Sequence, residues 1–140
     1  MSFIPKVLII AGSDSGGGAG IQADIKTTSY FNGYAMTAIT AITAQNTIGV
    51  QSIYPLPKEI VMEQINSITT DLSPDIVKIG MLADLDIIEY ISKKISNYKI
   101  VLDPVMVATS GDVLVSDEVV SSIKNNLINK SFLITPNIYE

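Results

Sequence analysis

Apolar positions along the 140-residue chain follow two spacings in turn, and the alternation predicts strands and helices one after another. Short runs rich in β-branched or small apolar residues predict strands at 6–11, 34–44, 50–54, 75–80, 99–103 and 132–135. Apolar residues three and four positions apart predict helices at 21–31, 58–70, 84–96 and 117–126. Strands that alternate with helices of this length predict an α/β fold with a mostly parallel sheet and helices on both faces.

Local signals mark some of the element boundaries. Asp84 precedes a predicted helix and is placed to act as its N-cap, and Asn32-Gly33 is a stop signal for the first helix. The stretch 50–54 ends at Pro55, which predicts an edge strand or a flap. The faces expected to be buried are Ile21, Ile25 and Thr28 in the first helix, Ile60, Val61, Ile65 and Ile68 in the second, and Leu85, Ile88, Ile91 and Ile95 in the third.

The sequence stops five residues after the last predicted strand, and no predicted helix follows to cover that strand. An uncovered strand leaves apolar surface and unpaired backbone groups, so doubly wound domains rarely stop at such a point. We therefore expect residues 1–140 to be the N-terminal part of a single domain. The alternative is that the final strand is an edge strand and the tail is disordered.

Composition excludes several classes of protein. Apolar residues make up 47% of the chain and the mean hydropathy is +0.38, which is too apolar for intrinsic disorder. No run of apolar residues is long enough to span a membrane, and residues 1–10 lack the features of a signal peptide, so we expect a cytoplasmic protein. The net charge of −5 and the absence of any Lys cluster larger than Lys93-Lys94 argue against a nucleic-acid surface.

The chain contains neither Cys nor His, and this narrows the possible chemistry. A thiolate nucleophile, a Ser-His-Asp triad, and metal sites built on thiolates or imidazoles are all excluded within this chain.

A glycine-rich stretch at 12–20 follows the first predicted strand, at the edge of the sheet where ligands bind in open α/β folds. It matches neither the phosphate-binding loop of nucleotide-hydrolysing enzymes nor the dinucleotide-binding loop, because Gly18-Ala19 and Ile21 stand at decisive positions. The stretch either brings backbone close to a ligand or is a flexible surface loop. Asp24, in the first turns of the following helix, either favours the helix N-terminus or accepts hydrogen bonds from a ligand amine.

Other polar or soft residues follow the later strands. Gln45 carries a donor and an acceptor that can pair with the edge of a heterocycle, or it belongs to an ordinary turn. Met81 suits the flat face of a ring, although a Met on its own is more often a core residue. Asp103 is a candidate for metal or proton chemistry, with Gly111-Asp112 further along. Asn137 and Glu140 suit an outer-sphere Mg²⁺ network around phosphates, or they form an exposed terminus.

Five motifs together resemble the hydroxymethylpyrimidine and phosphomethylpyrimidine kinases of the ribokinase-like superfamily, in the order and spacing of that family. The motifs lie at 11–27, 43–50, 78–82, 103–112 and 134–140. The resemblance implies a ribokinase-like fold and two ATP- and Mg²⁺-dependent steps of thiamine biosynthesis. The first phosphorylates 4-amino-5-hydroxymethyl-2-methylpyrimidine, and the second converts the monophosphate to the diphosphate.

The resemblance also implies roles for individual residues. Gln45 is similar to the residue that pairs with the pyrimidine. The residues that would line the pocket beside it are Gly12, Asp24, Met81 and Val105. Asp103, Asn137 and Glu140 resemble the elements that lie near Mg²⁺ and phosphate, with Glu140 as an outer-sphere metal contact. The resemblance further implies a homodimer in which the flap after Thr47 takes part.

The chain departs from the family in length, because family members run to roughly twice this size. Their second half carries a Gly-Thr-Gly-Cys anion hole with a catalytic Cys and most of the nucleotide site, so no catalytic residue is assigned to this chain. We expect impaired catalysis in the isolated chain. The alternatives are a split enzyme that needs a separate C-terminal chain, a remnant that binds the pyrimidine without phosphoryl transfer, and a pyridoxal-type kinase of the same superfamily.

Overall fold

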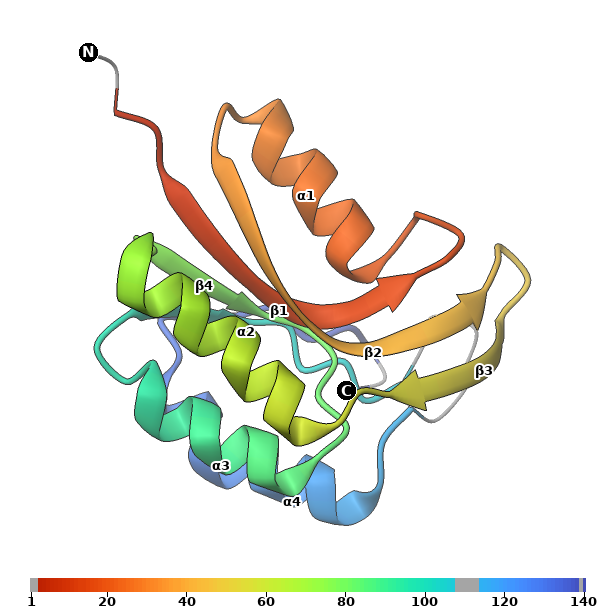
Figure 1. Cartoon of the computed structure of the whole chain (residues 1–140). Coiled ribbons are helices and arrows are strands. Elements are labelled where there is room, and N and C mark those ends of the chain that lie inside the picture. Colours follow the sequence, from red (N-terminus) through yellow and green to blue (C-terminus); the bar gives the residue numbers. More distant parts are fainter. Residues whose placement is uncertain (1–2, 108–113, 139) are drawn as a thin grey trace.

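The computed structural model describes residues 3–107, 114–138 and 140, and its strands form one six-stranded sheet in the order β3-β2-β1-β4-β5-β6 (Figure 1). The strands are β1 (Lys6–Asp14), β2 (Tyr34–Gln45), β3 (Val50–Pro55), β4 (Ile76–Ile79), β5 (Lys99–Leu102) and β6 (Leu133–Ile134). The helices are α1 (Gly20–Tyr30), α2 (Lys58–Asp71), α3 (Leu85–Lys94) and α4 (Asp117–Asn126), followed by a short 3₁₀ turn, η1 (Ile128–Lys130). β2 and β3 pair in antiparallel fashion, and the other neighbouring pairs are parallel. The predicted α/β fold is therefore confirmed.

The helices lie in two layers, one on each face of the sheet (Figure 1). α1 packs on β1 and β2, whereas α2, α3 and α4 lie on the opposite face. Side chains alternate along a strand, so Leu8 and Ile10 enter the larger core under the three helices. Ile9 and Ala11 face the other way and pack with Ile21 of α1. Each face of β1 thus has its own apolar layer.

The local boundary signals are confirmed, with small shifts. The Asp84 side chain accepts a hydrogen bond from the Ile87 N–H at 3.0 Å and caps α3. β3 is an edge strand, as Pro55 predicted. β1 is longer than predicted: it shifts register after Ala11 and continues to pair with β2 through Asp14. The glycine-rich loop therefore begins later than the sequence indicated.

Three residues expected on buried helix faces are exposed instead. Ile25 is 36% exposed, Ile60 is 43% exposed and Leu85 is 44% exposed. The stripe that is buried is narrower than the apolar pattern, and each of these residues lies at its edge. The buried positions are Ile21 in α1, Val61 and Ile65 in α2, and Ile87, Ile88, Ile91 and Ser92 in α3.

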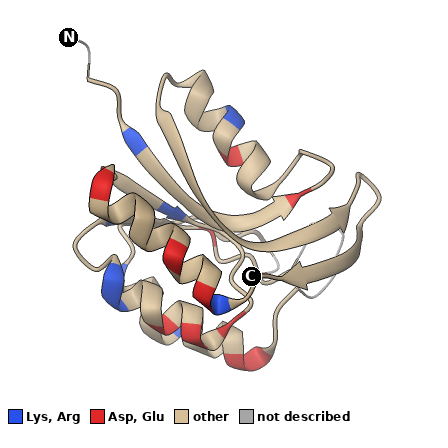
Figure 2. Cartoon of the chain, in the orientation of Figure 1, with Lys and Arg blue, Asp and Glu red and all other residues tan. Residues whose placement is uncertain are grey.

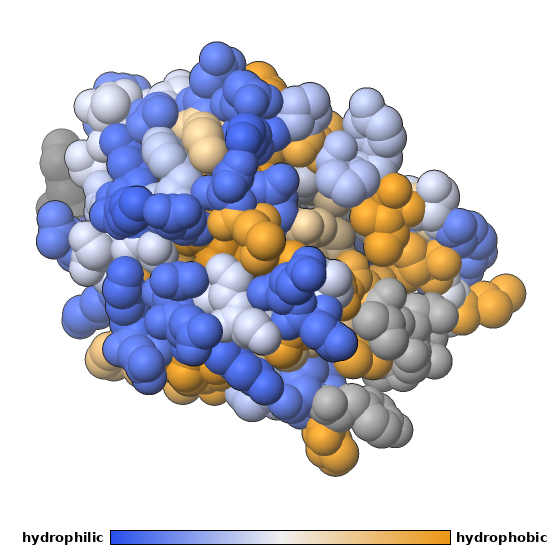
Figure 3. Space-filling view, turned by 90° about the horizontal axis from the view of Figure 1, so that it is seen from below, coloured by the Kyte–Doolittle hydropathy of each residue, from blue (hydrophilic) through white to orange (hydrophobic). Residues whose placement is uncertain are grey.

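Charged groups lie mainly on the helices and loops, but Lys78 lies within the otherwise apolar strand β4 (Figure 2). Hydrophilic side chains cover most of the face seen from below, and apolar side chains gather toward the side of the β2–β3 hairpin (Figure 3). That hairpin exposes Ile42, Ile48 and Tyr54. None of the helices in the described part of the chain has the length and apolarity needed to cross a membrane.

The sheet is only partly covered on the α1 side. The register places Lys78, Val101 and Leu133 side by side on that face, on β4, β5 and β6. α1 packs on β1 and β2, and among the described residues no helix packs over β6 on this side. Leu133 is 50% exposed and the preceding Phe132 is 73% exposed.

Gly20 makes the sharp passage from the loop into α1. Its φ angle of +53° is in the left-handed region, and a Cβ placed there would lie 2.2 Å from the Gly12 carbonyl oxygen. We predict that Gly20→Ala lowers the free energy of unfolding by about 2 kcal/mol or more, because strain and a backbone clash add together. Urea unfolding measures this loss.

Gly18→Ala is the matched control, since its Cβ would meet no atom closer than 3.9 Å. That variant is expected to stay within about 0.5 kcal/mol of the wild-type chain. Equal stability of the two variants would contradict the assignment of Gly20 as a required glycine.

Candidate functional site

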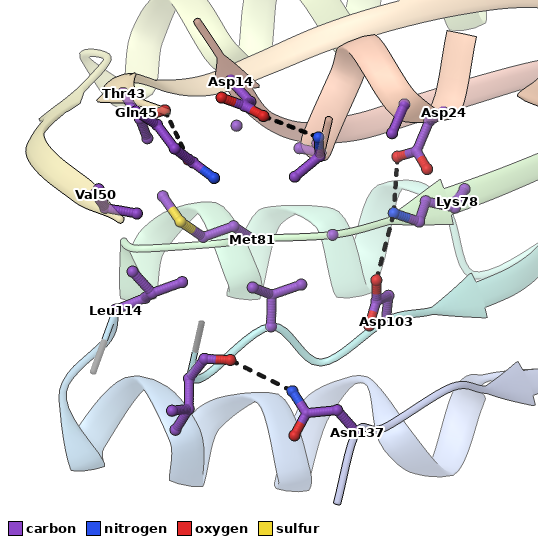
Figure 4. Close-up of a pocket in the computed structure, with 18 of the residues that line it drawn as sticks. Asp14, Asp24, Thr43, Gln45, Val50, Lys78, Met81, Asp103, Leu114 and Asn137 are labelled. Atoms are coloured by element: carbon purple, nitrogen blue, oxygen red, sulfur yellow. Dashed lines mark hydrogen bonds and ion pairs between the residues drawn. The ribbon is translucent and has the colours of Figure 1, made fainter. Parts of the chain in front are cut away.

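A pocket of about 360 Å³ opens at the carboxyl ends of β1, β2, β4 and β5, where open α/β sheets bind their ligands (Figure 4). It is lined by every site residue expected from the sequence: Gly12, Asp24, Gln45, Met81, Asp103, Val105, Asn137 and Glu140. Their individual roles stay predictions. The structure adds further lining residues, of which Asp14, Thr43 and Lys78 are polar. The Gly111-Asp112 pair lies outside the described residues.

Asp14 fixes the glycine-rich loop from within. Its buried carboxylate accepts hydrogen bonds from the N–H groups of Gly16 at 2.7 Å and of Gly18 and Ala19 at 2.9 Å. The Asp14 carbonyl accepts a further bond from the Gly17 N–H at 3.1 Å. Asp14 is only 6% exposed, so these bonds are protected from water.

The loop is therefore not a free phosphate cradle. The amides of Gly16, Gly17, Gly18 and Ala19, which would serve an anion in a phosphate-binding loop, already serve Asp14. The loop instead forms one side of the pocket, and Asp14 holds it in a fixed position. The sequence reasoning missed Asp14, although Asp followed closely by Gly is typical of turns in which the side chain bonds to the backbone ahead.

Gln45 is held at one end of the pocket by two neighbours. The Thr43 hydroxyl lies 3.1 Å from both the Ser13 carbonyl and Gln45 Oε1, and its single proton serves one of them at a time. The Ser15 hydroxyl accepts from the Gln45 N–H at 2.8 Å and donates to the Gln45 carbonyl at 2.7 Å. The amide nitrogen Nε2 points into the pocket (Figure 4) and has no hydrogen-bond partner among the described residues.

The opposite end of the pocket carries three charges. Lys78 Nζ donates to Asp24 Oδ2 at 2.7 Å and lies 3.7 Å from Asp103 Oδ2 (Figure 4). Burial raises the pKa of the Asp103 carboxyl above its usual value, and the Lys78 ammonium opposes that shift, while Glu140 and Asp24 add to it. Sequence reasoning quoted Lys78 within a motif without giving it a role. Its signal was a charged residue inside an otherwise apolar strand.

Asn137 and Glu140 join the segments that follow β5 and β6. Glu140 Oε1 accepts from the Met106 N–H at 2.8 Å, and Oε2 accepts from the Asn137 N–H at 3.1 Å. The Asn137 side chain donates to the Val107 carbonyl at 3.3 Å. Both Glu140 oxygens thus hold backbone in place, which gives this carboxylate a structural task beside the metal role that the sequence suggested.

Apolar groups line the space between the polar ends. Met81 is 7% exposed, and its carbonyl accepts a hydrogen bond from the Thr40 hydroxyl at 2.8 Å, which ties the segment after β4 to β2. Val105 lies on the wall that follows β5. A small pocket with an apolar middle and a few polar groups at its ends suits a flat heterocycle with hydrogen-bonding edges.

The sheet, its two helical layers and the pocket at the carboxyl ends of the strands are those of the ribokinase-like fold. The crystal structure of phosphomethylpyrimidine kinase from Clostridium difficile 630 is similar, with a TM-score of 0.88 and 46% identity, over 99% of this chain and 61% of that one. The pyridoxal kinase from Staphylococcus aureus in complex with AMP-PCP has a TM-score of 0.85 and 33% identity, over 99% and 50% of the two chains.

This chain belongs to the phosphomethylpyrimidine kinase family, whose model matches residues 14–140. It is 51% identical over 140 residues to the hydroxymethylpyrimidine/phosphomethylpyrimidine kinase of Bacillus subtilis, over 98% of this chain and 52% of that protein. The family predicted from the five motifs is therefore confirmed. The chain spans about half the length of the curated kinases of this kind that it matches.

We predict that Asp14→Asn lowers the free energy of unfolding by about 2 kcal/mol, because an amide offers one acceptor oxygen to the loop and turns an NH₂ group toward backbone donors. Urea unfolding tests this. The control is Asp71→Asn at the exposed end of α2, which is expected to leave stability nearly unchanged. A wild-type value for Asp14→Asn would contradict the role given to this carboxylate.

The raised pKa of Asp103 predicts a pH-dependent cost of folding. A folded-state pKa above the unfolded value means that ionisation of this carboxyl destabilises the fold as pH rises through that pKa. Asp103→Asn is therefore expected to be more stable than the wild-type chain at pH 7, with the difference fading as pH falls toward about 4. Urea unfolding across this range, with Asp71→Asn as control, measures it. A difference that grows on acidification would have the wrong sign.

Proposed function

We propose that this chain forms the pyrimidine-binding part of a kinase that phosphorylates 4-amino-5-hydroxymethyl-2-methylpyrimidine and then its monophosphate in thiamine biosynthesis. Family membership supports the kinase class and implies ATP as the phosphate donor. The observation that supports this choice of substrate is the pocket itself. Gln45 Nε2 and Asp24 Oδ1 lie at its two ends with the apolar Met81 wall between them, and neither atom has a hydrogen-bond partner among the described residues.

An aminopyrimidine offers the complementary pattern. A ring nitrogen accepts a hydrogen bond next to an amino group that donates one, and the Gln45 amide offers a donor and an acceptor in the same way. Its carbonyl oxygen has a second lone pair beside the one that faces Thr43. Asp24 Oδ1 then accepts from a remaining donor of the ligand, and Met81 packs against the ring.

Asp103 is the residue that would hold a magnesium ion. The described residues contain no cluster of three or more side chains suited to coordinate a metal, so a cage made by the protein alone does not fit. A hydrated Mg²⁺ fits better, since it keeps several waters and uses one or two carboxylates together with phosphates. When bound, the ion offsets the negative charge of the phosphates. Glu140 contributes by holding the segments after β5 and β6 beside Asp103.

Phosphoryl transfer itself, in this proposal, requires the part of the fold that the chain does not span. The chain covers 52% of its Bacillus subtilis relative and has no Cys, whereas the resemblance gives the family a catalytic Cys in its second half. That half would come from the same polypeptide or from a separate chain. The homodimer implied by the resemblance is also a proposal, with the exposed Ile42, Ile48 and Tyr54 of the β2–β3 hairpin as its contact.

Calorimetric titration with the hydroxymethyl pyrimidine tests the proposed substrate. The wild-type chain is expected to bind it, and Gln45→Ala is expected to bind at least about 10-fold more weakly because a paired edge is lost. Gln51→Ala is the matched control: Gln51 is exposed on β3, outside the pocket lining, and its removal should leave affinity unchanged.

Pyridoxal serves as the competing ligand in the same titration. Tighter binding of pyridoxal than of the pyrimidine would favour a pyridoxal-type kinase, the class of the similar Staphylococcus aureus structure. If Gln45→Ala binds the pyrimidine as tightly as the wild-type chain, or if the wild-type chain does not bind it, the proposed recognition of the pyrimidine is overturned.

A further inference from the structure

Lys78 is a charged residue that the alternation of a strand turns into the pocket. Val77 and Ile79, its neighbours on β4, are fully buried in the core under the three helices. Lys78 therefore faces the α1 side, where the sheet register pairs it with Ile9 and Val101. Its side chain is only 19% exposed. An ammonium group held among apolar neighbours is costly unless it is paired.

The pairing is with two carboxylates that come from separate elements. Asp24, in α1, lies 2.7 Å from Lys78 Nζ, and Asp103, which follows β5, lies 3.7 Å from it. Lys78 is the only basic residue among the described residues that line the pocket. The chain has no Arg, and residues 108–113 include neither Lys nor Arg. Without Lys78, Asp24 and Asp103 would share this end of the pocket with no opposite charge between them.

We propose that Lys78 is a positioning residue of this site, which holds Asp24 Oδ2 so that Oδ1 stays turned to the ligand. The inference rests on the proposed function and adds to it a residue that acts through Asp24. Lys78 is not a phosphate ligand in this account. Its single charge is already met by two carboxylates, so in the metal-free chain a phosphate approaching this end meets a negative balance of charge.

The two possible roles of Lys78 make different predictions for two ligands. A residue that positions Asp24 affects the hydroxymethyl pyrimidine and its monophosphate equally, because both carry the same ring. A phosphate ligand affects only the monophosphate. Loss of a hydrogen bond to a charged group is expected to weaken binding by about 10-fold.

The experiment titrates both ligands by calorimetry into the wild-type chain and four variants. These are Lys78→Met, Lys78→Arg, Asp24→Asn and the double variant that combines Lys78→Met with Asp24→Asn. Lys78→Met is expected to bind both ligands about 10-fold more weakly, and Lys78→Arg is expected to recover most of the loss. The double variant is expected to bind no more weakly than Asp24→Asn alone, because Lys78 acts through Asp24. A loss of packing alone would instead add to the effect of Asp24→Asn. Lys94→Met, at an exposed position of α3, is the control.

Three outcomes overturn the proposal. A loss confined to the monophosphate makes Lys78 a phosphate ligand, and additive losses in the double variant remove the coupling to Asp24. If Lys78→Met binds both ligands with wild-type affinity while Gln45→Ala loses binding, the role proposed for Lys78 is wrong and the proposed function stays intact.

A measurement without ligand separates this proposal from the proposed function. The ¹³Cγ resonance of Asp24 in the free chain is expected to move in Lys78→Met and to return toward its wild-type position in Lys78→Arg. If the wild-type chain binds neither ligand, the proposed function fails, and this resonance still decides whether Lys78 holds Asp24. An unchanged resonance in Lys78→Met overturns the proposal on its own.

Discussion

The carboxylate of Asp14 and the backbone amides that it binds set the geometry on which the pocket depends. A glycine-rich loop has high conformational entropy, and its exposed amides need partners. Asp14 supplies those partners from a buried position at the end of β1. Ser15, in the loop that Asp14 fixes, bridges both backbone polar groups of Gln45. The orientation of Gln45 thus depends on a carboxylate that uses three backbone bonds to shape the protein.

The other end of the pocket depends on charge. Lys78, Asp24 and Asp103 come from β4, from α1 and from the segment after β5, and they meet because parallel strands end at the same edge of the sheet. Burial raises the pKa of Asp103, so the ionised carboxylate lowers the free energy of unfolding at neutral pH. Functional sites commonly contain such destabilising groups. Rigid elements hold both ends, so a flat ligand between them meets groups already in place.

Sequence reasoning recovered the parts of this account that periodicity and motif order encode. Every predicted strand and helix is present, and the site residues at the strand ends converge because the topology is mostly parallel. It placed Ile25, Ile60 and Leu85 on buried faces, since spacing along a helix does not say how wide a stripe the neighbouring layer covers. The roles of Asp14 and Lys78 were not predicted from the sequence, for a related reason. Their roles depend on which amides or carboxylates lie opposite them, and only the folded chain brings those groups together.

The central claim is that the pocket between Gln45 and Asp24 binds a hydroxymethyl pyrimidine, and mapping backbone amide shifts during titration with that ligand tests it most directly. The account predicts that ¹H–¹⁵N resonances change together at Gly12, Asp24, Gln45 and Met81, whose residues line the pocket. The amides of α3 and α4, which cover the far face of the sheet, should stay in place. Changes centred on those helices, or none at ligand concentrations in the millimolar range, would contradict the account.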